Sequence, residues 1–198
     1  MAISDRRARY RAARRDAIVA AARRLAAAEG WEAVTTRRLA AAVEYSQPVL
    51  YAHFGCMDEL VAAVALEGFG ELAEALRAAG SGASSGAEAL RRLAAAYVGF
   101  AVEHPALYDA MFTRSTTLHF GAEDTPAALT DAFAALREVV ALIASTPDVE
   151  TYAEVVWAGL HGLVTLDRDQ RLRPGHVDER LDLLVAALVP GDPRPRRA

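Results

Sequence analysis

The sequence predicts an all-α fold of about nine helices, and three observations support this prediction. Apolar residues recur at helical spacing through most of the 198 residues, and breaks rich in glycine, serine or proline separate the periodic stretches. Hydrophobic residues make up 53% of the chain, and many of them are alanines, which favours closely packed helices over disorder. No stretch shows the alternation of a half-buried β-strand, and no internal repeat is found.

Three helices are predicted at the N-terminal end. The first spans residues 7–29 and ends at Gly30, a natural C-terminal stop. The second spans residues 36–43, and after a tight turn the third begins on Ser46, a good N-cap, with Pro48 tolerated in its first turn. Apolar residues of the first helix are expected to pack on the other two: Ile18, Ala21, Ala22 and Leu25 on Leu39, Val43 and Leu50.

Two short helices across a tight turn form a helix-turn-helix, whose second helix fits the major groove of DNA. The side chains at the predicted turn and helix are of the types that read bases. Arg37 can donate two hydrogen bonds to guanine, and Gln47 can bond an adenine edge. Pro48 and Val49 can contact the methyl group of thymine. The pattern therefore indicates a surface that binds double-stranded DNA.

The pieces TTRRLA, SQPVLYAHF and DEL, in this order and spacing, resemble the DNA-binding domain of the TetR family of repressors. The resemblance implies eight DNA-binding residues: Thr36, Arg37, Ser46, Gln47, Pro48, Val49, Tyr51 and His53. Arg37 and Gln47 would contact bases, Pro48 and Val49 would pack on thymine, and Ser46 would cap the helix. Thr36, Tyr51 and His53 would hold phosphates. Two positions depart from the family pattern. Glu44 replaces the usual turn glycine, which predicts a strained or reshaped turn, and Met57 replaces a lysine that would contact phosphate.

The charge distribution agrees with DNA binding at one end of the chain. The net charge of −4 by itself argues weakly against nucleic acid. However, residues 1–57 hold ten arginines and five acids, whereas residues 58–198 hold twelve arginines and twenty-one acids. A basic module on an acidic body fits a DNA-binding unit attached to a unit with another role. Six arginines near the start of the chain are expected to attract the DNA backbone or, as the alternative, to form a solvated face: Arg6, Arg7, Arg9, Arg11, Arg14 and Arg15.

We therefore predict a helix-turn-helix domain at residues 1–60, a larger helical ligand-binding and dimerisation domain at residues 61–189, and a disordered proline-rich tail at residues 190–198. Loops are expected at residues 80–86 and 113–124. The helices of the larger domain are expected near residues 57–79, 87–103, 105–112, 126–144, 148–168 and 177–189. The long helix that begins at Met57 would link the two domains.

The larger domain contains a Trp157–His161–Gly162 pattern that is similar to the Trp-His-Gly class of TetR-family C-terminal domains. Trp157 and His161 lie four residues apart and share a helix face. Together with other aromatic residues they are candidates to line an apolar effector site, with ordinary core packing as the alternative for each: Tyr97, Phe100, Tyr108, Met111, Phe112, Phe133, Trp157 and His161. We expect a small apolar or aromatic effector. No metal site and no cofactor are predicted, because the five histidines are scattered without a ligand pair.

The last two long helices carry more apolar residues than a small core needs, and a two-fold bundle would bury the surplus. The family resemblance implies that this is a homodimer interface, formed by Leu160, Leu163, Val164, Leu181, Leu184, Val185 and Leu188. With a single cysteine, Cys56, and neither a signal peptide nor a membrane-spanning run, we expect a cytoplasmic protein that binds no membrane. The predicted function is a ligand-responsive repressor of a palindromic operator. The alternatives are a DNA-binding dimer without an effector and a helical enzyme, which would lack any recognisable nucleophile–base pair.

Overall fold

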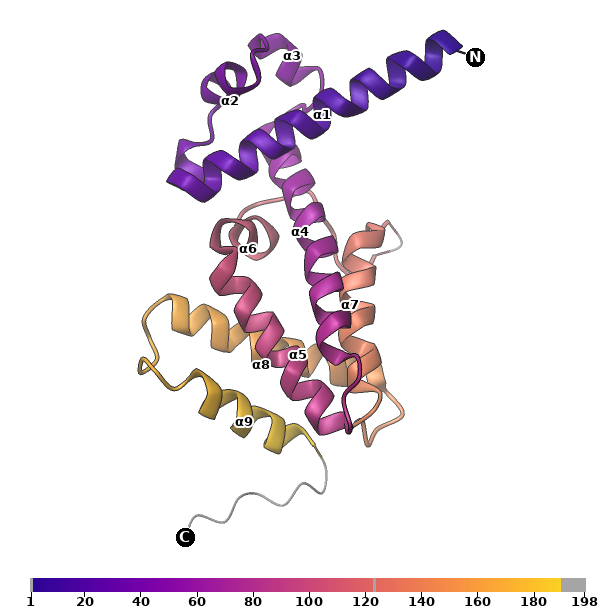
Figure 1. Ribbon diagram of the computed structural model, residues 1–198, viewed down its shortest axis with the longest axis vertical. Helices are drawn as coiled ribbons and strands as arrows, with labels where there is room; N and C mark the ends of the chain where they lie inside the picture. Colours follow the sequence, from indigo (N-terminus) through magenta and orange to yellow (C-terminus); the bar gives the residue numbers. More distant parts are fainter. Residues whose placement is uncertain (1, 123, 190–198) are drawn as a thin grey trace. The chain divides into compact units, whose positions relative to one another are not determined.

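A computed structural model describes residues 2–122 and 124–189 of the chain, and within these residues all regular secondary structure is helical, with no β-strand. This confirms the predicted all-α class (Figure 1). The predicted tail at residues 190–198 lies outside the described residues. The α-helices of the described part are α1 (Ala2–Glu29), α2 (Thr36–Val43), α3 (Gln47–Tyr51), α4 (Met57–Gly80), α5 (Gly86–Glu103), α6 (Pro105–Phe112), α7 (Ala127–Val140), α8 (Val149–Arg168) and α9 (Val177–Leu188), and a 3₁₀ helix, η1, spans Trp31–Ala33.

The structure differs from the predicted helices at three places. Helix α1 already runs from Ala2, whereas the prediction began it at residue 7. Helix α7 ends at Val140 rather than at residue 144, because the amides of Leu142 and Ile143 bond carbonyls three residues back and tighten the chain into a turn. The short η1 was not predicted; it follows Gly30, whose φ of 82° turns the chain.

The chain divides into two compact units. Among the described residues, the first comprises those up to Gly68 and those between His104 and Pro126, and the second comprises those from Phe69 to Glu103 and from Ala127 onward. In the first unit, α1 packs on α2, η1 and α6 through fully buried side chains that include Ile18 and Val19, and Leu39 and Leu50 are buried with them. Leu25 and Val43, which were expected in this core, are half-buried. The predicted domain boundary at residue 60 stays a prediction.

Polar contacts attach α6 and the following loop to the start of the chain within the first unit. The indole Nε1 of Trp31 donates to the carbonyl oxygen of Ala106 at 2.7 Å. The guanidinium of Arg114 lies 5.7 Å from the centroid of the Trp31 ring and pairs with Glu32 at 3.0 Å. These contacts fasten α6 to the segment that leads into α2.

In the second unit, α5 is the central helix and packs on α7, α8 and α9. Leu90 and Leu93 of α5 are almost completely buried. Arg91 pairs with Asp178 at 2.9 Å and with Asp182 at 2.5 Å, and these two ion pairs hold α9 against α5.

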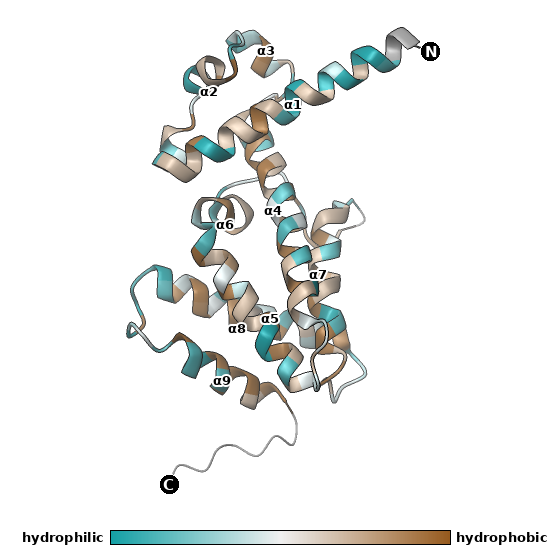
Figure 2. Ribbon diagram, in the orientation of Figure 1, coloured by the Kyte–Doolittle hydropathy of each residue, from teal (hydrophilic) through white to brown (hydrophobic). Residues whose placement is uncertain are grey.

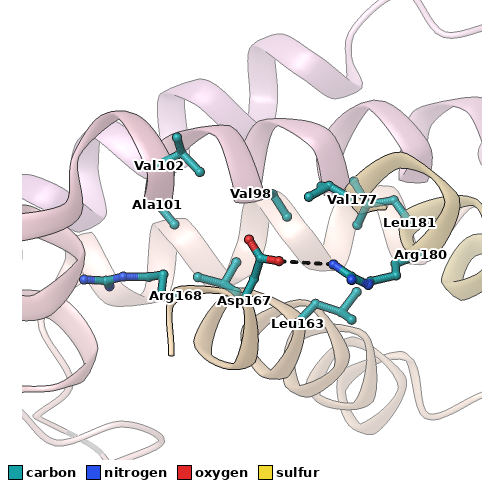
Figure 3. A pocket seen from close by; sticks show the side chains of 10 residues that line it. Val98, Ala101, Val102, Leu163, Asp167, Arg168, Val177, Arg180 and Leu181 are labelled. Carbon is teal, nitrogen blue, oxygen red and sulfur yellow. Dashed lines mark hydrogen bonds and ion pairs between the residues drawn. The ribbon is translucent and has the colours of Figure 1, made fainter. Parts of the chain in front are cut away.

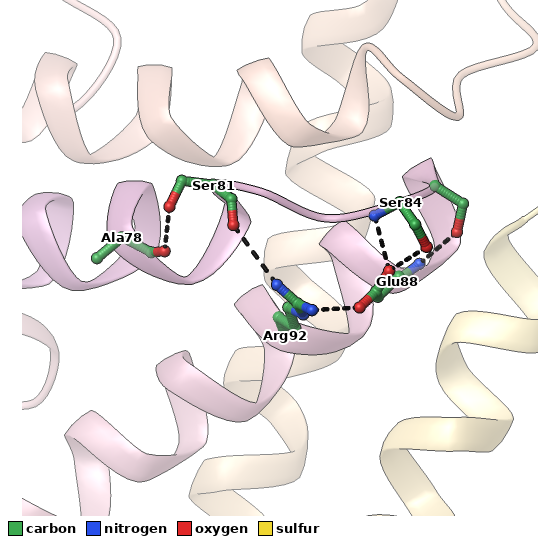
Figure 4. A network of polar contacts seen from close by, with 6 residues as sticks. Ala78, Ser81, Ser84, Glu88 and Arg92 are labelled. Atoms are coloured by element: carbon green, nitrogen blue, oxygen red, sulfur yellow. Dashed lines mark hydrogen bonds and ion pairs between the residues drawn. The ribbon is translucent and has the colours of Figure 1, made fainter.

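The connection from α4 to α5 is held by a polar network (Figure 4). Glu88 accepts a hydrogen bond from the backbone amide of Ser84 at 2.7 Å, and its own amide bonds the hydroxyl of Ser85 at 3.2 Å. Arg92 pairs with Glu88 one turn later and reaches the carbonyl of Ser81. The serine-rich composition that predicted a loop here therefore also supplies the cap that starts α5.

Candidate nucleic-acid interface

Helices α2 and α3 are joined by the tight turn that a helix-turn-helix requires. The hydroxyl of Thr35 caps α2 by accepting a hydrogen bond from the amide of Arg38 at 3.3 Å. Glu44 ends α2 with φ 57° and ψ 35°, and the amide of Tyr45 bonds the carbonyl of Ala40 at 3.0 Å. The turn therefore keeps the left-handed shape that glycine favours, although the residue is glutamate. Left-handed backbone costs an L-residue roughly 1–2 kcal/mol, so the expected strain is located at this residue.

Helix α3 is short and is anchored by one buried side chain. Leu50 faces the core, whereas Gln47, Pro48 and Tyr51 are exposed. Ser46 occupies the N-cap position as predicted, but its hydroxyl makes no capping hydrogen bond. The expected side-chain cap was therefore wrong, because Pro48 has no amide hydrogen and the amide of Val49 bonds the Ser46 carbonyl instead.

Two neighbouring arginines of α2 have different environments. Arg38 pairs with Glu29 through two hydrogen bonds of 2.8 and 2.5 Å, and this pairing lowers the pKa of the Glu29 carboxyl below its ordinary value. Arg37 is exposed, and no carboxylate of the described residues pairs with it. Of the two arginines, Arg37 is therefore the one available to a DNA base, as the sequence predicts.

All eight predicted DNA-binding residues lie in the first unit, on α2, on α3 or within two residues of α3. Thr36, Val49 and His53 are half-buried and the other five are exposed. The arrangement suits a reading surface, because exposed hydrogen-bonding groups on two short helices can enter a groove while a buried leucine fixes the second helix.

An open groove lies beside the end of α3. Its lining comprises Arg7, Tyr10, Arg11 and Arg14 of α1 with Ala52 and His53 after α3. Burial, followed by the charges of Arg11, Arg14 and Arg15, lowers the pKa of His53 below its ordinary value. The arginines and His53 were predicted separately as phosphate-binding residues. Tyr10 was not predicted, although residues 7, 10, 11 and 14 are spaced to share one helix face.

In the second unit, the structure brings together three of the predicted effector residues. The indole Nε1 of Trp157 donates to the hydroxyl of Tyr97 at 3.2 Å, and this hydroxyl lies 3.4 Å from Nδ1 of His161. Because the hydroxyl accepts from Trp157, its one hydrogen can point to Nδ1, which leaves the ring hydrogen of a neutral His161 on Nε2. Burial lowers the pKa of His161, in agreement with a neutral ring.

The other predicted effector residues are spread over both units. Phe100 is buried on α5 and Phe133 is half-buried on α7, in the second unit. Tyr108, Met111 and Phe112 lie on α6 in the first unit, with the rings of Tyr108 and Phe112 4.7 Å apart. The Tyr97–Trp157–His161 cluster therefore joins three of the predicted effector residues through hydrogen bonds.

Figure 3 shows a small cavity of the second unit between α5, α8 and α9. Apolar side chains such as Val98 and Leu163 line it, and Asp167 pairs with Arg180 across it at 3.1 Å. Its volume of about 30 Å³ has room for about two water molecules. Drug-sized ligands need roughly 300–1,000 Å³, so this cavity as it stands is too small for such an effector.

Neither a metal-binding cluster nor a membrane-spanning helix is found among residues 2–122 and 124–189. No group of three or more metal-ligating side chains lies close enough together to hold an ion there. Within the same residues, no helix is sufficiently long and apolar to cross a membrane.

Two segments of the chain match models of known protein families. Residues 18–64 match the family described as bacterial regulatory proteins, tetR family, and residues 90–188 match the tetracyclin repressor-like C-terminal domain. An uncharacterized HTH-type transcriptional regulator of Mycobacterium tuberculosis is 30% identical over 156 residues, which are 77% of this chain and 69% of that protein.

Solved structures share the fold. A protein of unknown function from Rhodococcus sp. RHA1 superposes with a TM-score of 0.71 at 25% identity, covering 88% of this chain and 93% of that one. The TetR family transcriptional regulator PfmR from Thermus thermophilus superposes with a TM-score of 0.59 at 21% identity, covering 87% and 96% of the two chains.

Proposed function

The chain belongs to the tetR family of bacterial regulatory proteins, which are DNA-binding transcriptional regulators and not enzymes. From this premise we propose that it is a repressor that binds a palindromic operator as a homodimer in the cytoplasm and is released by a small apolar or aromatic effector. The observation that carries the proposal is the exposed reading surface of α2 and α3, with Arg37 available beside the paired Arg38.

In this proposal the reading surface divides its work between bases and phosphates. Arg37 and Gln47 hydrogen-bond base edges, and Pro48 and Val49 pack on thymine methyl groups. Thr36, Ser46, Tyr51 and His53 contact the sugar–phosphate backbone and fix the register of α3. The unbonded hydroxyl of Ser46 supports this role, because a hydroxyl that caps no helix can donate to a phosphate.

The homodimer is proposed to form through α8 and α9, with a stripe of residues that differs from the predicted one. Leu160, Val164, Leu181 and Val185 are buried in the chain's own core, each at 6% exposure or less, so they have no surface to offer a partner. The opposite side of α8 carries Val155 at 53% and Leu166 at 40% exposure, and α9 carries Leu183 at 69%.

Two glycines of α8 support the same face. A Cβ at Gly162 would meet no atom within 4 Å, so this position faces open space that a partner helix can fill. A Cβ at Gly159 would lie 3.2 Å from Leu184, so α9 packs closely against α8 beside this face. A two-fold axis through this face would place the same residues of two copies against each other, so a second copy of the chain is the proposed occupant.

The effector is proposed to bind near the Tyr97–Trp157–His161 cluster. Its indole and phenol rings supply apolar surface, and the half-buried imidazole of His161 supplies a polar group at the same place. Helix α4 is the proposed link, because its residues up to Gly68 belong to the first unit and those from Phe69 to the second. An effector that prefers one conformation of the second unit would move α4 and change the spacing of two reading surfaces.

Selection of DNA from a random duplex library by the purified protein tests the proposal. We expect enrichment of a palindrome with half-sites about one helical turn apart, or a multiple of this distance, bound by a dimer. Release of that DNA is then measured with a panel of small aromatic and apolar compounds. If a palindrome is selected but no compound releases it, the alternative of a DNA-binding dimer without an effector is favoured; if no sequence is enriched, the proposed function is wrong.

A further inference from the structure

We propose that the groove between the first turns of α1 and the end of α3 is a second DNA site, which receives backbone phosphates outside the bases read by α3. This inference rests on the proposed function, because it extends the DNA contact of the same unit. It assigns Arg7, Tyr10, Arg11 and Arg14 to phosphate binding beside His53, which all line the groove.

One face of α1 changes its chemistry halfway along the helix. Ile18, Ala21 and Ala22 lie on the face that packs into the first unit, and they are at most 2% exposed. By helical spacing, Arg7, Arg11 and Arg14 continue this same face toward the start of α1. Figure 2 shows the corresponding change from hydrophobic to hydrophilic residues along α1. Apolar residues at these positions would be expected to close against α3, whereas arginines leave a groove that an anion can enter.

The charges of this segment are sorted by face. Asp5 and Asp16 are the acidic residues of the first 28, and by helical spacing both lie opposite Arg7, Arg11 and Arg14. Within the described part of the chain, none of these three arginines pairs with a carboxylate. A merely solvated helix gains nothing from gathering like charges on its inner face. A polyanion that enters the groove offsets their mutual repulsion.

Neighbouring rings hold the groove in place. The guanidinium of Arg14 lies 5.8 Å from the centroid of the Tyr45 ring, and that of Arg15 lies 4.9 Å from the centroid of Phe54. Tyr45 belongs to the turn before α3 and Phe54 follows it, so α1 is fastened at both ends of the reading helix. A phosphate in the groove would therefore be positioned relative to the bases that α3 reads.

The groove also predicts a longer footprint on DNA. Residues 2–16 of α1 have a helical length of roughly 22 Å, and Figure 1 shows the start of α1 running on past α2 and α3. The described side chains of this segment are all exposed. The segment is thus an arm that can follow the backbone beyond the half-site.

The test compares two double variants with the same change of charge on the same helix. Arg7→Gln with Arg11→Gln removes two groove arginines, and Arg6→Gln with Arg9→Gln removes two arginines from the outer side of α1. Binding of the selected duplex is measured against salt concentration. We expect the groove variant to bind at least about tenfold more weakly and to lower the slope of log K against log salt by about two, with a much smaller effect of the outer variant.

A second readout uses duplexes with and without base pairs flanking the selected palindrome. Flanking pairs should strengthen binding by the wild type and by the outer variant but not by the groove variant. Equal behaviour of the two variants, with wild-type selection intact, would overturn the groove site and leave the proposed function standing. A wild-type protein that selects no duplex would overturn both.

Discussion

The reading surface of the first unit and the aromatic cluster of the second unit place their polar groups in opposite ways. Gln47, Arg37 and Tyr51 are exposed, and Tyr51 keeps 54% of its surface accessible. Tyr97, by contrast, is 3% exposed and bonds both Trp157 and His161. A surface that binds a large rigid partner can keep its hydrogen-bonding groups exposed to solvent. A site for a small molecule must instead be formed by side chains inside the packed helices. In the second unit, the residues proposed to bind the effector therefore also stabilise the packing of the helices.

The largest effect is expected at the dimer face, on which both regions depend. Leu183→Glu places a charge on the exposed apolar face of α9, which a partner would bury without a counter-charge. We expect folded monomers by light scattering and a loss of operator affinity of at least about a hundredfold, because each monomer offers one reading surface. Leu142→Glu is the control: this leucine is 67% exposed but lies after α7, and its variant should stay dimeric. A dimeric Leu183→Glu protein would refute the proposed face.

Substitutions at Arg37, Gln47 and Tyr51 test which residues of the exposed region contact bases and which contact phosphates. Gln47→Ala or Arg37→Ala should cost about 1–3 kcal/mol of operator binding and relax the preference at one operator position. Tyr51→Phe should weaken binding to all sequences alike, since a phosphate contact carries no sequence information. None of the three should change the free energy of unfolding by more than about 0.5 kcal/mol, because all are exposed. A uniform loss from Gln47→Ala across operator variants would contradict its assignment to a base.

The same substitution type should behave differently in the buried cluster. Tyr97→Phe removes the hydroxyl that accepts from Trp157 and bonds His161, and should lower the free energy of unfolding by about 1–3 kcal/mol. The effector concentration that releases the operator should change, whereas operator affinity in the absence of effector should stay the same. Tyr152→Phe removes a hydroxyl that donates to the carbonyl of Leu188, and serves as the control for a loss of stability alone. Equal induction curves for both variants and the wild type would place the effector site elsewhere.

The contrast also explains what could be predicted from the sequence. The helices follow from apolar periodicity and from breaks such as Gly30 and residues 81–85, and the candidate DNA-reading residues follow from their types at fixed spacing along a short segment. The pairing of Tyr97 with His161 could not be predicted, because 64 residues separate them and periodicity carries no information on which helices meet.

The dimer stripe shows a related limit of sequence reasoning. Leu160 and Leu183 both fit an apolar helical pattern, but the pattern does not say which side of an apolar helix faces its own chain. Only the packing of α9 on α5 and α8 separates the buried side from the side available to a partner. Likewise, the end of α7 depends on a local tightening of hydrogen bonds after Val140, which no residue type marks.

Two histidines allow the regions to be compared through pH. Burial lowers the pKa of both His53 and His161, so each is less easily protonated in the folded protein than in the unfolded chain, and its contribution to stability is lost as pH falls through the folded pKa. A DNA phosphate beside His53 would raise its pKa on binding, so that DNA binding takes up a proton. For a rise of one pKa unit, operator affinity should then increase by about two- to fourfold as pH falls from about 7.5 to about 6, toward a limit of about tenfold at lower pH.

The controls for this pH dependence are His53→Gln and His161→Gln. The first should flatten the pH profile of operator binding, because the titrating group is gone. The second should leave the profile unchanged, because His161 lies in the second unit, where no DNA phosphate is proposed to bind. A pH-independent wild-type affinity would mean that His53 does not contact a phosphate.

The smallest effect is expected at two residues with the same backbone strain. Glu44 in the reading unit and Gln170 in the second unit both have a φ of 57°, in the left-handed region that favours glycine. Glycine at either position relieves roughly 1–2 kcal/mol of strain but gives back part of it through the entropy of the unfolded chain, so each variant should be more stable by about 0.5–1 kcal/mol.

If the turn only needs to be left-handed, Glu44→Gly will stabilise the protein and, by removing a negative charge next to the DNA, tighten operator binding. Gln170→Gly will stabilise the protein equally without changing operator binding. A Glu44→Gly protein that is more stable but binds the operator more weakly would instead show that the stiffness of the glutamate turn holds α3 in its reading position.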